Sequence, residues 1–207
     1  KLNGTRGRIP FESQMNHVRS RSVLALARRF GYEALHAHHI AFLATRLFDE
    51  TDKIHKLGNQ EKEWLEAAAL LHDIGYFVSH AGHHRHSMYL IRSAGLLGFS
   101  SSEVVIIAAL TRYHRKGLPR PEHREMSELT PAEIASVMQL SGILRVADGL
   151  DRSHRQLVKD LTCKIDSNKV TIKVSTRSQM EMELFAAEER ADLMEQQFGR
   201  RIRFKSV

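Results

Sequence analysis

The chain has 207 residues, of which 42% are hydrophobic and 27% charged, and its formal net charge at pH 7 is +7. This composition suits one globular domain with a sizeable core and excludes a largely disordered chain. No apolar run is long enough to cross a membrane, so we expect no membrane partner. The excess of positive charge favours anionic partners, although a basic solvated surface alone produces the same balance.

Two features bear on the cellular compartment. Residues 1–10 are basic and polar and lack the apolar centre of a secretory signal. Cys163 is the single cysteine, so it has no partner for an internal disulfide. We therefore expect a cytoplasmic protein.

Apolar residues recur at helical spacing through most of the chain. We predict helices over residues 18–30, 33–50, 59–74, 83–94, 100–113 and 131 to about 155. Gly31 and Gly75 suit helix C-termini, Asn59 suits an N-cap, and Pro131 suits a first helical turn. Residues 115–130 contain two prolines and are predicted to form a loop.

After Leu157 the period of the apolar residues changes. Residues 161–166 and 170–175 alternate on either side of a short turn, which predicts a hairpin. We predict a third strand at 180–184, a helix over 185–198 and a last strand over 201–205. The expected fold class is therefore mainly α. A helical bundle over residues 1–157 is followed by a small α+β tail over 158–207, with short antiparallel strands and one helix.

Thirteen histidines make a metal site worth considering, and their positions favour one. His72 and Asp73 are adjacent at the end of an apolar helix, where they offer a nitrogen and an oxygen to a divalent cation. His36 lies on the apolar side of the second predicted helix, and Asp148 interrupts the apolar pattern of the sixth. A histidine on an apolar face is more often an ordinary core residue, but a buried carboxylate is costly unless it is paired or binds a cation. Three helices thus direct ligand-type groups to the interior, which together favour a metal.

The order of these residues resembles the HD superfamily of metal-dependent phosphohydrolases. The resemblance rests on the segments ALHAHHIAFLA, ALLHDIG and LRVADGLD. His38 and His39 are neighbours that could be confused with the first ligand, but His36 fits better because it precedes the apolar Ile40 by four residues. The resemblance implies four metal ligands: His36, His72, Asp73 and Asp148.

Two further histidines extend this resemblance to HD proteins with two metals. His83 and His114 lie where such proteins carry extra ligands, and Asp73 would then bridge two ions. His84 and His86 remain alternatives to His83. The expected cofactor is one or two divalent ions, with Mn, Fe, Mg, Co and Zn all open, because mixed histidine and aspartate ligation does not select one of them.

Cationic residues accompany these ligands. Arg115 and Lys116 follow the last histidine of the set, and Asp151 and Arg152 follow Asp148. Such cations can hold substrate phosphate beside a metal, although a solvated basic face is their usual role. We expect Asp151 to orient a water molecule or to support a ligand. The expected catalytic residues are Asp73, Arg115, Lys116 and Arg152.

Longer segments are similar to the C-terminal region of the exopolyphosphatase/guanosine pentaphosphatase (Ppx/GppA) family. These segments are RSVLALARRFGY, AAALLHDIGYFVSHAGHHRHSMYLI, RYHRKG and ADGLDRSHRQLVKDL. The similarity runs from about Arg21 to Phe204 and includes the tail. In that family, hydrolysis of polyphosphate or pentaphosphate belongs to an N-terminal actin-like domain with glycine-rich phosphate loops. We find no such loop, and the residues before Arg21 are too few for that domain, so the resemblance does not imply the polyphosphatase activity.

Together these features predict a metal-dependent phosphohydrolase that acts on a phosphate ester or anhydride, in a nucleotide, an alarmone or a polyphosphate-like molecule. The alternative is a non-catalytic regulatory module that binds polyphosphate or a nucleotide. Nucleic acid is not an expected partner, because no aromatic-rich strand or reading helix stands out. The edge of the tail could pair with another chain, so the sequence allows a homodimer.

Overall fold

The computed structural model describes residues 18–176 and 179–207. The predicted absence of a secretory signal concerns residues 1–10, which lie outside these ranges. The helical part contains α1 (Val18–Arg29), α2 (Ala34–Glu50), α3 (Asp52–His55), α4 (Asn59–Leu71), η2 (Ile74–Phe77), α5 (His83–Ala94), α6 (Ser101–Tyr113), η3 (Arg124–Met126) and α7 (Pro131–Gly149). The tail contains β1 (Val158–Ile165), β2 (Lys169–Thr176), α8 (Glu181–Glu188), α9 (Asp192–Phe198) and β3 (Arg201–Ser206).

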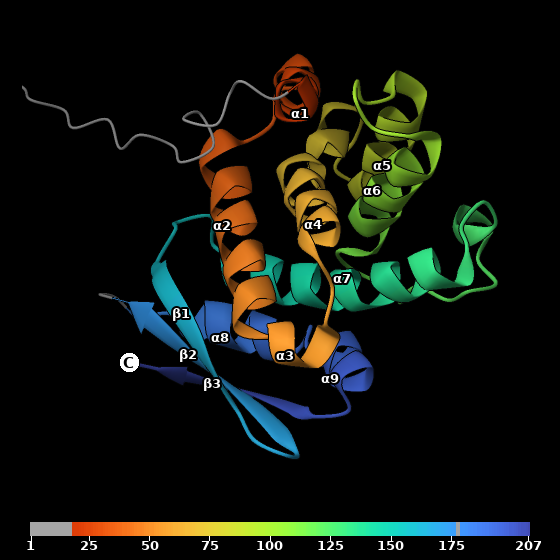
Figure 1. Ribbon diagram of the computed structural model, residues 1–207. Coiled ribbons are helices and arrows are strands. Elements are labelled where there is room, and N and C mark those ends of the chain that lie inside the picture. Colours follow the sequence, from red (N-terminus) through yellow and green to blue (C-terminus); the bar gives the residue numbers. More distant parts are fainter. Residues whose placement is uncertain (1–17, 177–178) are drawn as a thin grey trace, which may run out of the picture.

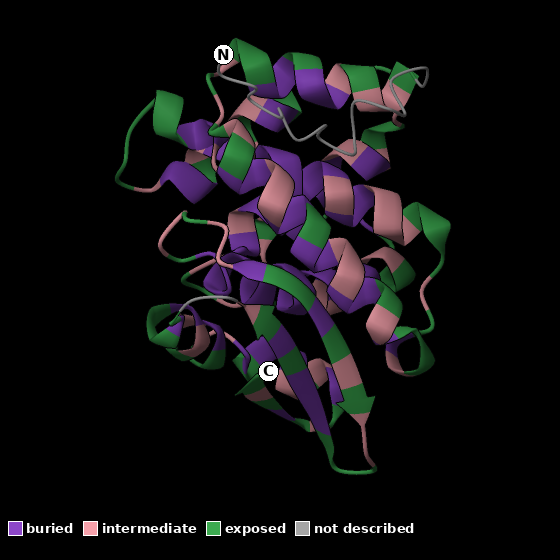
Figure 2. Cartoon of the chain, turned by 90° about the vertical axis from the view of Figure 1, so that its left-hand side faces the viewer, coloured by how far each residue is buried: buried purple, intermediate pink, exposed green. Residues whose placement is uncertain are grey.

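The helices form a bundle whose centre is α4 (Figure 1). α4 packs between α2 and α6, α1 lies across one end, and α7 runs beneath all three central helices. α5 packs beside α6 and η2. Buried residues fill the middle of the molecule, where these helices meet (Figure 2). The mainly α architecture with a small sheet at its C-terminal end confirms the predicted fold class.

The ends of the helices follow local chemistry. α6 and α7 begin with capping boxes, in which Ser100 pairs with Glu103 and Thr130 pairs with Glu133. Pro131 stands in the first turn of α7, as predicted. The N-cap of α4 is Gly58, so Asn59 is the first helical residue and not the predicted cap.

α7 ends sooner than predicted, at Gly149. Beyond it, the carboxylate of Asp151 accepts a hydrogen bond from the backbone N–H of Gln156 at 2.7 Å. His154 and Gln156 adopt left-handed backbone conformations, with φ of 58° and 50°. The side chain of Asp151 therefore closes a turn where the apolar pattern alone suggested continued helix.

The tail differs from the prediction in three respects. Residues 181–188 form α8, so the predicted strand at 180–184 is wrong, and the single helix over 185–198 is divided into α8 and α9. α8 buries Glu183 and Ala187, which are four residues apart, and this helical spacing outweighs the short alternating pattern. β3 pairs parallel to β2, because α8 and α9 carry the chain back along the sheet before β3 begins. The antiparallel pairing of β1 with β2 is as predicted.

Two glycines of α7 allow the tail to pack closely on the bundle. A Cβ atom at Gly149 would lie 2.7 Å from the Cα of Ala187, and one at Gly142 would lie 3.0 Å from the Cα of Met194. The buried residues of the sheet belong to the same apolar cluster as those of α7. The division of the chain at residue 157 stays a prediction. None of the helices within the described ranges is long and apolar enough to span a membrane.

Candidate metal centre

One carboxylate, Asp73, lies between two pairs of histidines. Its Oδ2 is 3.4 Å from Nε2 of His72 and 4.0 Å from Nε2 of His36. Its Oδ1 is 3.2 Å from Nε2 of His83 and 3.6 Å from Nε2 of His114. The structure thus brings together the four histidines that the sequence singled out, around the aspartate expected to bridge two ions.

Asp148 completes the first of these two groups. It lies on α7, and its Oδ1 is 3.8 Å from Nε2 of both His36 and His72. Within the described ranges, His36, His72 and Asp73 form one set of groups close enough to share a metal ion, and Asp73, His83 and His114 form another. His38 instead contacts the hydroxyl of Tyr32, and His84 and His86 belong to neither set.

A close approach between two elements places the ligands of the second set. A Cβ atom at Gly75 would lie 2.0 Å from the backbone oxygen of His83, so only glycine lets η2 meet the start of α5. Ser87 binds both sides of this junction, because its hydroxyl donates to the carbonyl of His72 at 2.6 Å and accepts from the N–H of Gly75 at 2.9 Å. The junction between η2 and α5 therefore fixes the position of His83 relative to His72 and Asp73.

Each of the four histidines is oriented through its other ring nitrogen, Nδ1. The partners of Nδ1 are oxygens that can only accept a hydrogen bond, so Nδ1 carries the proton and Nε2 presents a lone pair. Such support of ligating histidines is the usual arrangement in metal sites. The Nδ1 contacts are His36 with Asp151 Oδ2 at 2.8 Å, His72 with Ala69 O at 2.7 Å, His83 with His80 O at 3.1 Å and His114 with Thr111 O at 2.7 Å.

Two of these lone pairs are buried without a partner. The Nε2 atoms of His36 and His72 make no hydrogen bond, and the two residues are 1% and 0% exposed. Buried polar atoms are normally satisfied, so two orphaned nitrogens facing carboxylates call for a cation. Ligand atoms about 2.1 Å from a shared ion lie about 3–4 Å apart, which matches the spacing around Asp73. The residues present therefore fit a divalent metal ion.

The ionisation states of the cluster also suit a cation. Burial alone would raise the pKa of Asp73, but the nearby His72, His83 and His114 hold it well below its usual range. Burial, with His72 next to it, lowers the pKa of His114 to about 3. Near neutral pH Asp73 is anionic and His114 is neutral, which are the forms that bind metals.

The second oxygen of Asp148 is held by a residue that sequence reasoning missed. Arg190, in the turn between α8 and α9, donates from Nη1 to Asp148 Oδ2. Burial opposes ionisation of Asp148, and Arg190 is the main influence that lowers its pKa. The two residues are 42 positions apart, so no local pattern reveals the pair.

His154 is a second residue that the sequence did not indicate. Its ring stacks on that of His36, with the ring centres 3.7 Å apart and the planes 3° from parallel. Nδ1 of His154 contacts Oε2 of Glu33 at 2.8 Å. His154 therefore covers one face of a candidate ligand, and its left-handed backbone hid it from a reading based on helical spacing.

Two of the predicted cationic residues, Arg115 and Arg152, lie near this centre. Arg115 Nη1 is 3.5 Å from His83 Nε2. Tyr76 stacks on the ring of His83 at 4.1 Å and lies within electrostatic range of both Arg115 and Arg152. Lys116 is exposed and has a left-handed backbone conformation. The catalytic roles assigned to Asp73, Arg115, Lys116 and Arg152 stay predictions.

The fold and the site together define a mainly α domain with a buried histidine and aspartate cluster. Residues 18–196 match the family model of Ppx/GppA phosphatase, domain III, and the chain belongs to this family. It is 24% identical over 182 residues to the guanosine-5'-triphosphate,3'-diphosphate pyrophosphatase of Vibrio vulnificus (strain YJ016), a match that covers 86% of this chain and 35% of that protein. It is also 24% identical over 178 residues to the protein of the same name from Vibrio parahaemolyticus serotype O3:K6 (strain RIMD 2210633), covering 83% and 36%. The chain spans about a third of the length of these relatives.

Proposed function

We propose that this chain is an HD-type, metal-dependent phosphohydrolase that acts on a phosphate ester or anhydride. The observation that carries the proposal is the pair of buried, unpartnered Nε2 atoms of His36 and His72 that face Asp73 and Asp148. A structural role for these residues would leave two orphaned nitrogens unexplained. The resemblance to HD proteins assigns the same residues to a metal.

The two groups around Asp73 would hold one or two ions. His36, His72 and Asp148 would hold an ion in one position, His83 and His114 would hold one in the other, and Asp73 would contribute to both. A bound divalent ion supplies Lewis acidity and neutralises charge on a phosphoryl group. Mn, Fe, Mg, Co and Zn are all compatible with this donor set.

Other residues of the chain would bind and orient the substrate. Arg115 and Arg152 lie near Tyr76, which stacks on the candidate ligand His83, and guanidinium groups there could hold phosphate oxygens in bidentate contacts. Lys116 offers a further charge on the adjacent loop. Tyr76 lies over the ring of His83 and keeps water from that face of the imidazole. These side chains would stabilise the negative charge that grows on the phosphate as the bond breaks.

Phosphoanhydrides of nucleotides are the first substrates to test, since both Vibrio relatives are named as pyrophosphatases of a guanosine phosphate. Purified protein reconstituted with each candidate metal is incubated with nucleotides, cyclic nucleotides, guanosine alarmones and polyphosphates. We expect turnover of at least one substrate, loss of turnover to background in His72→Ala/Asp73→Ala, and retained turnover in His86→Ala. His86 is a matched control because it lies on α5, outside both groups. A fully metal-loaded protein that hydrolyses no member of this panel would contradict the proposal.

The alternative function is a binding module for polyphosphate or a nucleotide. It is favoured by the match of this chain to only about a third of each relative, which leaves room for catalysis in another part of those proteins. Tight binding of a guanosine phosphate that persists in His72→Ala/Asp73→Ala, with no turnover by the parent, would establish it.

A further inference from the structure

The sheet of the tail gathers positive charge on one of its two faces. Side chains of directly paired residues point to the same side of a sheet, and alternate residues along a strand share a side. Lys173 is paired with Lys205, Lys169 is paired with Arg201, and Thr171 lies between Lys164 and Arg203. We call the resulting cluster the basic sheet face; it consists of Lys164, Lys169, Lys173, Arg201, Arg203 and Lys205.

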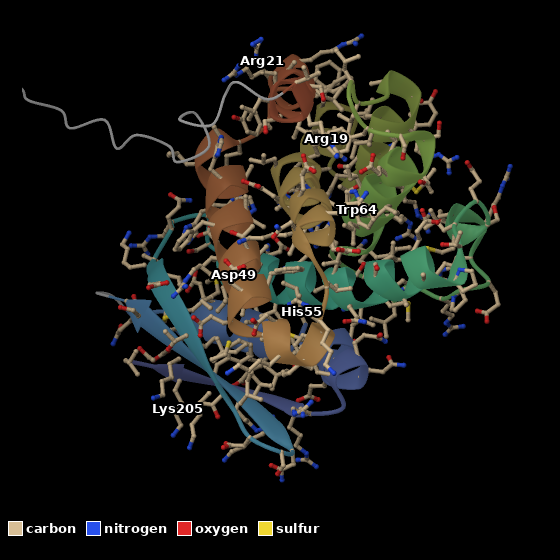
Figure 3. The ribbon with its side chains drawn as sticks, viewed as in Figure 1. Arg19, Arg21, Asp49, His55, Trp64 and Lys205 are labelled. Carbon is tan, nitrogen blue, oxygen red and sulfur yellow. The ribbon has the colours of Figure 1, made fainter. Side chains whose placement is uncertain are left out.

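This face is turned to solvent, whereas the other face is packed. Val170, Ile172 and Val174 alternate with the cations of β2, are 0% exposed and belong to the apolar core. All six members of the basic sheet face are exposed. Figure 3 shows Lys205 on the side of the sheet that points away from the helical body.

Carboxylates in the described part of the chain offset little of this charge. Asp160 also lies on this side of β1, but it is paired with Arg46 of α2 at 2.9 Å. Asp166 lies 3.8 Å from Lys164 and 4.0 Å from Lys169, and Glu195 lies 3.6 Å from Arg203. Such long, exposed pairs contribute little. Lys173, Arg201 and Lys205 form no ion pair within residues 18–176 and 179–207. The face therefore has a clear excess of positive charge.

Protection of sheet edges does not account for this arrangement. Charged residues often occupy edge strands, where they prevent pairing with other chains. Lys169 and Lys173, however, lie on β2, which is the central strand of the order β1–β2–β3. Like charges placed opposite each other destabilise a sheet, as Lys173 and Lys205 must do here. A polyanionic ligand would relieve that repulsion.

The chemistry of the face selects among polyanions. It carries no aromatic side chain on which single-stranded bases could stack. Among the exposed large apolar residues of the described ranges, only Val207, two positions after Lys205, continues β3 towards this side. One such side chain does not make the apolar or lipid anchor that stable attachment to a membrane needs besides basic charge. The cations cover three strands, about 10 Å across the strands and about 14 Å along them. This area suits the two phosphate backbones of a duplex better than one single-stranded polyanion.

We propose that the basic sheet face binds the phosphate backbone of duplex nucleic acid without reading its sequence. Nucleic acid was not expected as a partner from the sequence, because no aromatic-rich strand or reading helix stands out. The grouping of these cations becomes visible only in the register of β3 beside β2. The inference is independent of the metal centre.

The test measures binding of a short labelled DNA duplex to the metal-loaded chain at several salt concentrations. The logarithm of the affinity should fall against the logarithm of the salt concentration with a slope of about −3 to −5. In Lys173→Gln/Arg201→Gln/Lys205→Gln the slope should weaken by about 3, and affinity at low salt should fall by about tenfold or more. The control Arg28→Gln/Arg29→Gln/Lys53→Gln removes the same charge from the helical body and should bind nearly as the parent does.

Four outcomes would overturn the proposal. The parent could fail to bind the duplex at low salt, or the control triple variant could lose as much affinity as the sheet variant. A single-stranded oligonucleotide or inorganic polyphosphate could bind more tightly than the duplex. The protein could bind vesicles that contain anionic phospholipid, and the duplex could fail to compete for that binding. Thermal unfolding of each variant verifies that the sheet is intact.

Discussion

At the scale of single residues, the candidate centre depends on groups that hold the ligands as much as on the ligands themselves. His36 is held at Nδ1 by Asp151, which is 0% exposed, and is covered by the ring of His154. Asp151 also accepts the N–H of Gln156, so one carboxylate joins the turn after α7 to His36 of α2. The ligand and the turn that supports it are therefore one structural unit.

This arrangement predicts that Asp151→Asn weakens metal binding by about tenfold to a hundredfold, the usual effect of losing a supporting carboxylate. The amide can still contact His36 but no longer offers a charge. The measurement is a competitive titration with a chromophoric chelator. Asp166→Asn serves as the control, because Asp166 lies in the turn between β1 and β2. Equal affinities for both variants and the parent would show that Asp151 plays no part in the site.

The sequence revealed the candidate ligands but only some of the residues that hold them in place. His72, Asp73 and Asp148 interrupt apolar patterns, so a buried polar group at each position is visible in the chain itself. Arg190 and His154 interrupt no pattern, and their roles arise from contacts between segments far apart. Long-range partners of this kind need a structure to be seen.

At the scale of elements, Glu103 joins three helices. Its carboxylate caps α6 through the N–H of Ser100 at 2.7 Å and accepts from Trp64 Nε1 of α4 at 3.0 Å. It also pairs with Arg19 of α1; Figure 3 labels Arg19 and Trp64 in this region. Burial opposes ionisation, but the hydrogen bonds from Ser100, Trp64 and Arg19 lower the pKa of Glu103 to about 2.

Glu103 should therefore make stability depend on pH in a defined window. Its pKa in the folded state lies below the unfolded value of 4.5, so its contribution is complete above pH 4.5 and is lost as the pH falls towards 2. Glu103→Gln should lower the free energy of unfolding at pH 7 by about 1–3 kcal/mol, and the difference should shrink below pH 4.5. Urea unfolding at a series of pH values measures this. Glu133→Gln removes only the charge from an exposed capping box and should cost less; an equal cost, or a gap that widens on acidification, would contradict the assignment.

Helix positions were more predictable than strand pairing. Caps and helix stops such as Pro131 and Gly31 act on their immediate neighbours, so the chain itself reveals them. The direction of β3 depends on where α8 and α9 return the chain, and α8 itself is stabilised by burying Ala187 against Gly149. Those contacts are tertiary, which is why the tail was predicted with a third strand and only one helix.

At the scale of the whole molecule, the tail contributes to the candidate centre. Arg190 reaches Asp148 from the turn between α8 and α9, and the two glycines of α7 allow that approach. The small sheet is thus joined to the bundle both by apolar packing and by an ion pair at the candidate site.

Loss of the Arg190–Asp148 ion pair should lower the stability of the fold mainly when no metal is bound. Arg190→Gln leaves the buried carboxylate of Asp148 unpaired, which should lower the free energy of unfolding by about 2–4 kcal/mol in the presence of a chelator. A bound cation would replace the lost charge, so saturating Mn²⁺ should recover much of this difference. Urea unfolding with and without metal provides the comparison, and Arg203→Gln, which breaks an exposed pair, is the control. If metal does not reduce this loss of unfolding free energy, Arg190 does not act through the candidate metal site.

The most direct measurement is the metal content of the purified, reconstituted protein by elemental analysis. We predict one or two divalent ions per chain, at most one in His83→Ala/His114→Ala and none in His72→Ala/Asp73→Ala, with His86→Ala unchanged. A parent protein that retains no metal after reconstitution would contradict the account and leave His36, His72 and Asp73 as ordinary polar residues of a helical core.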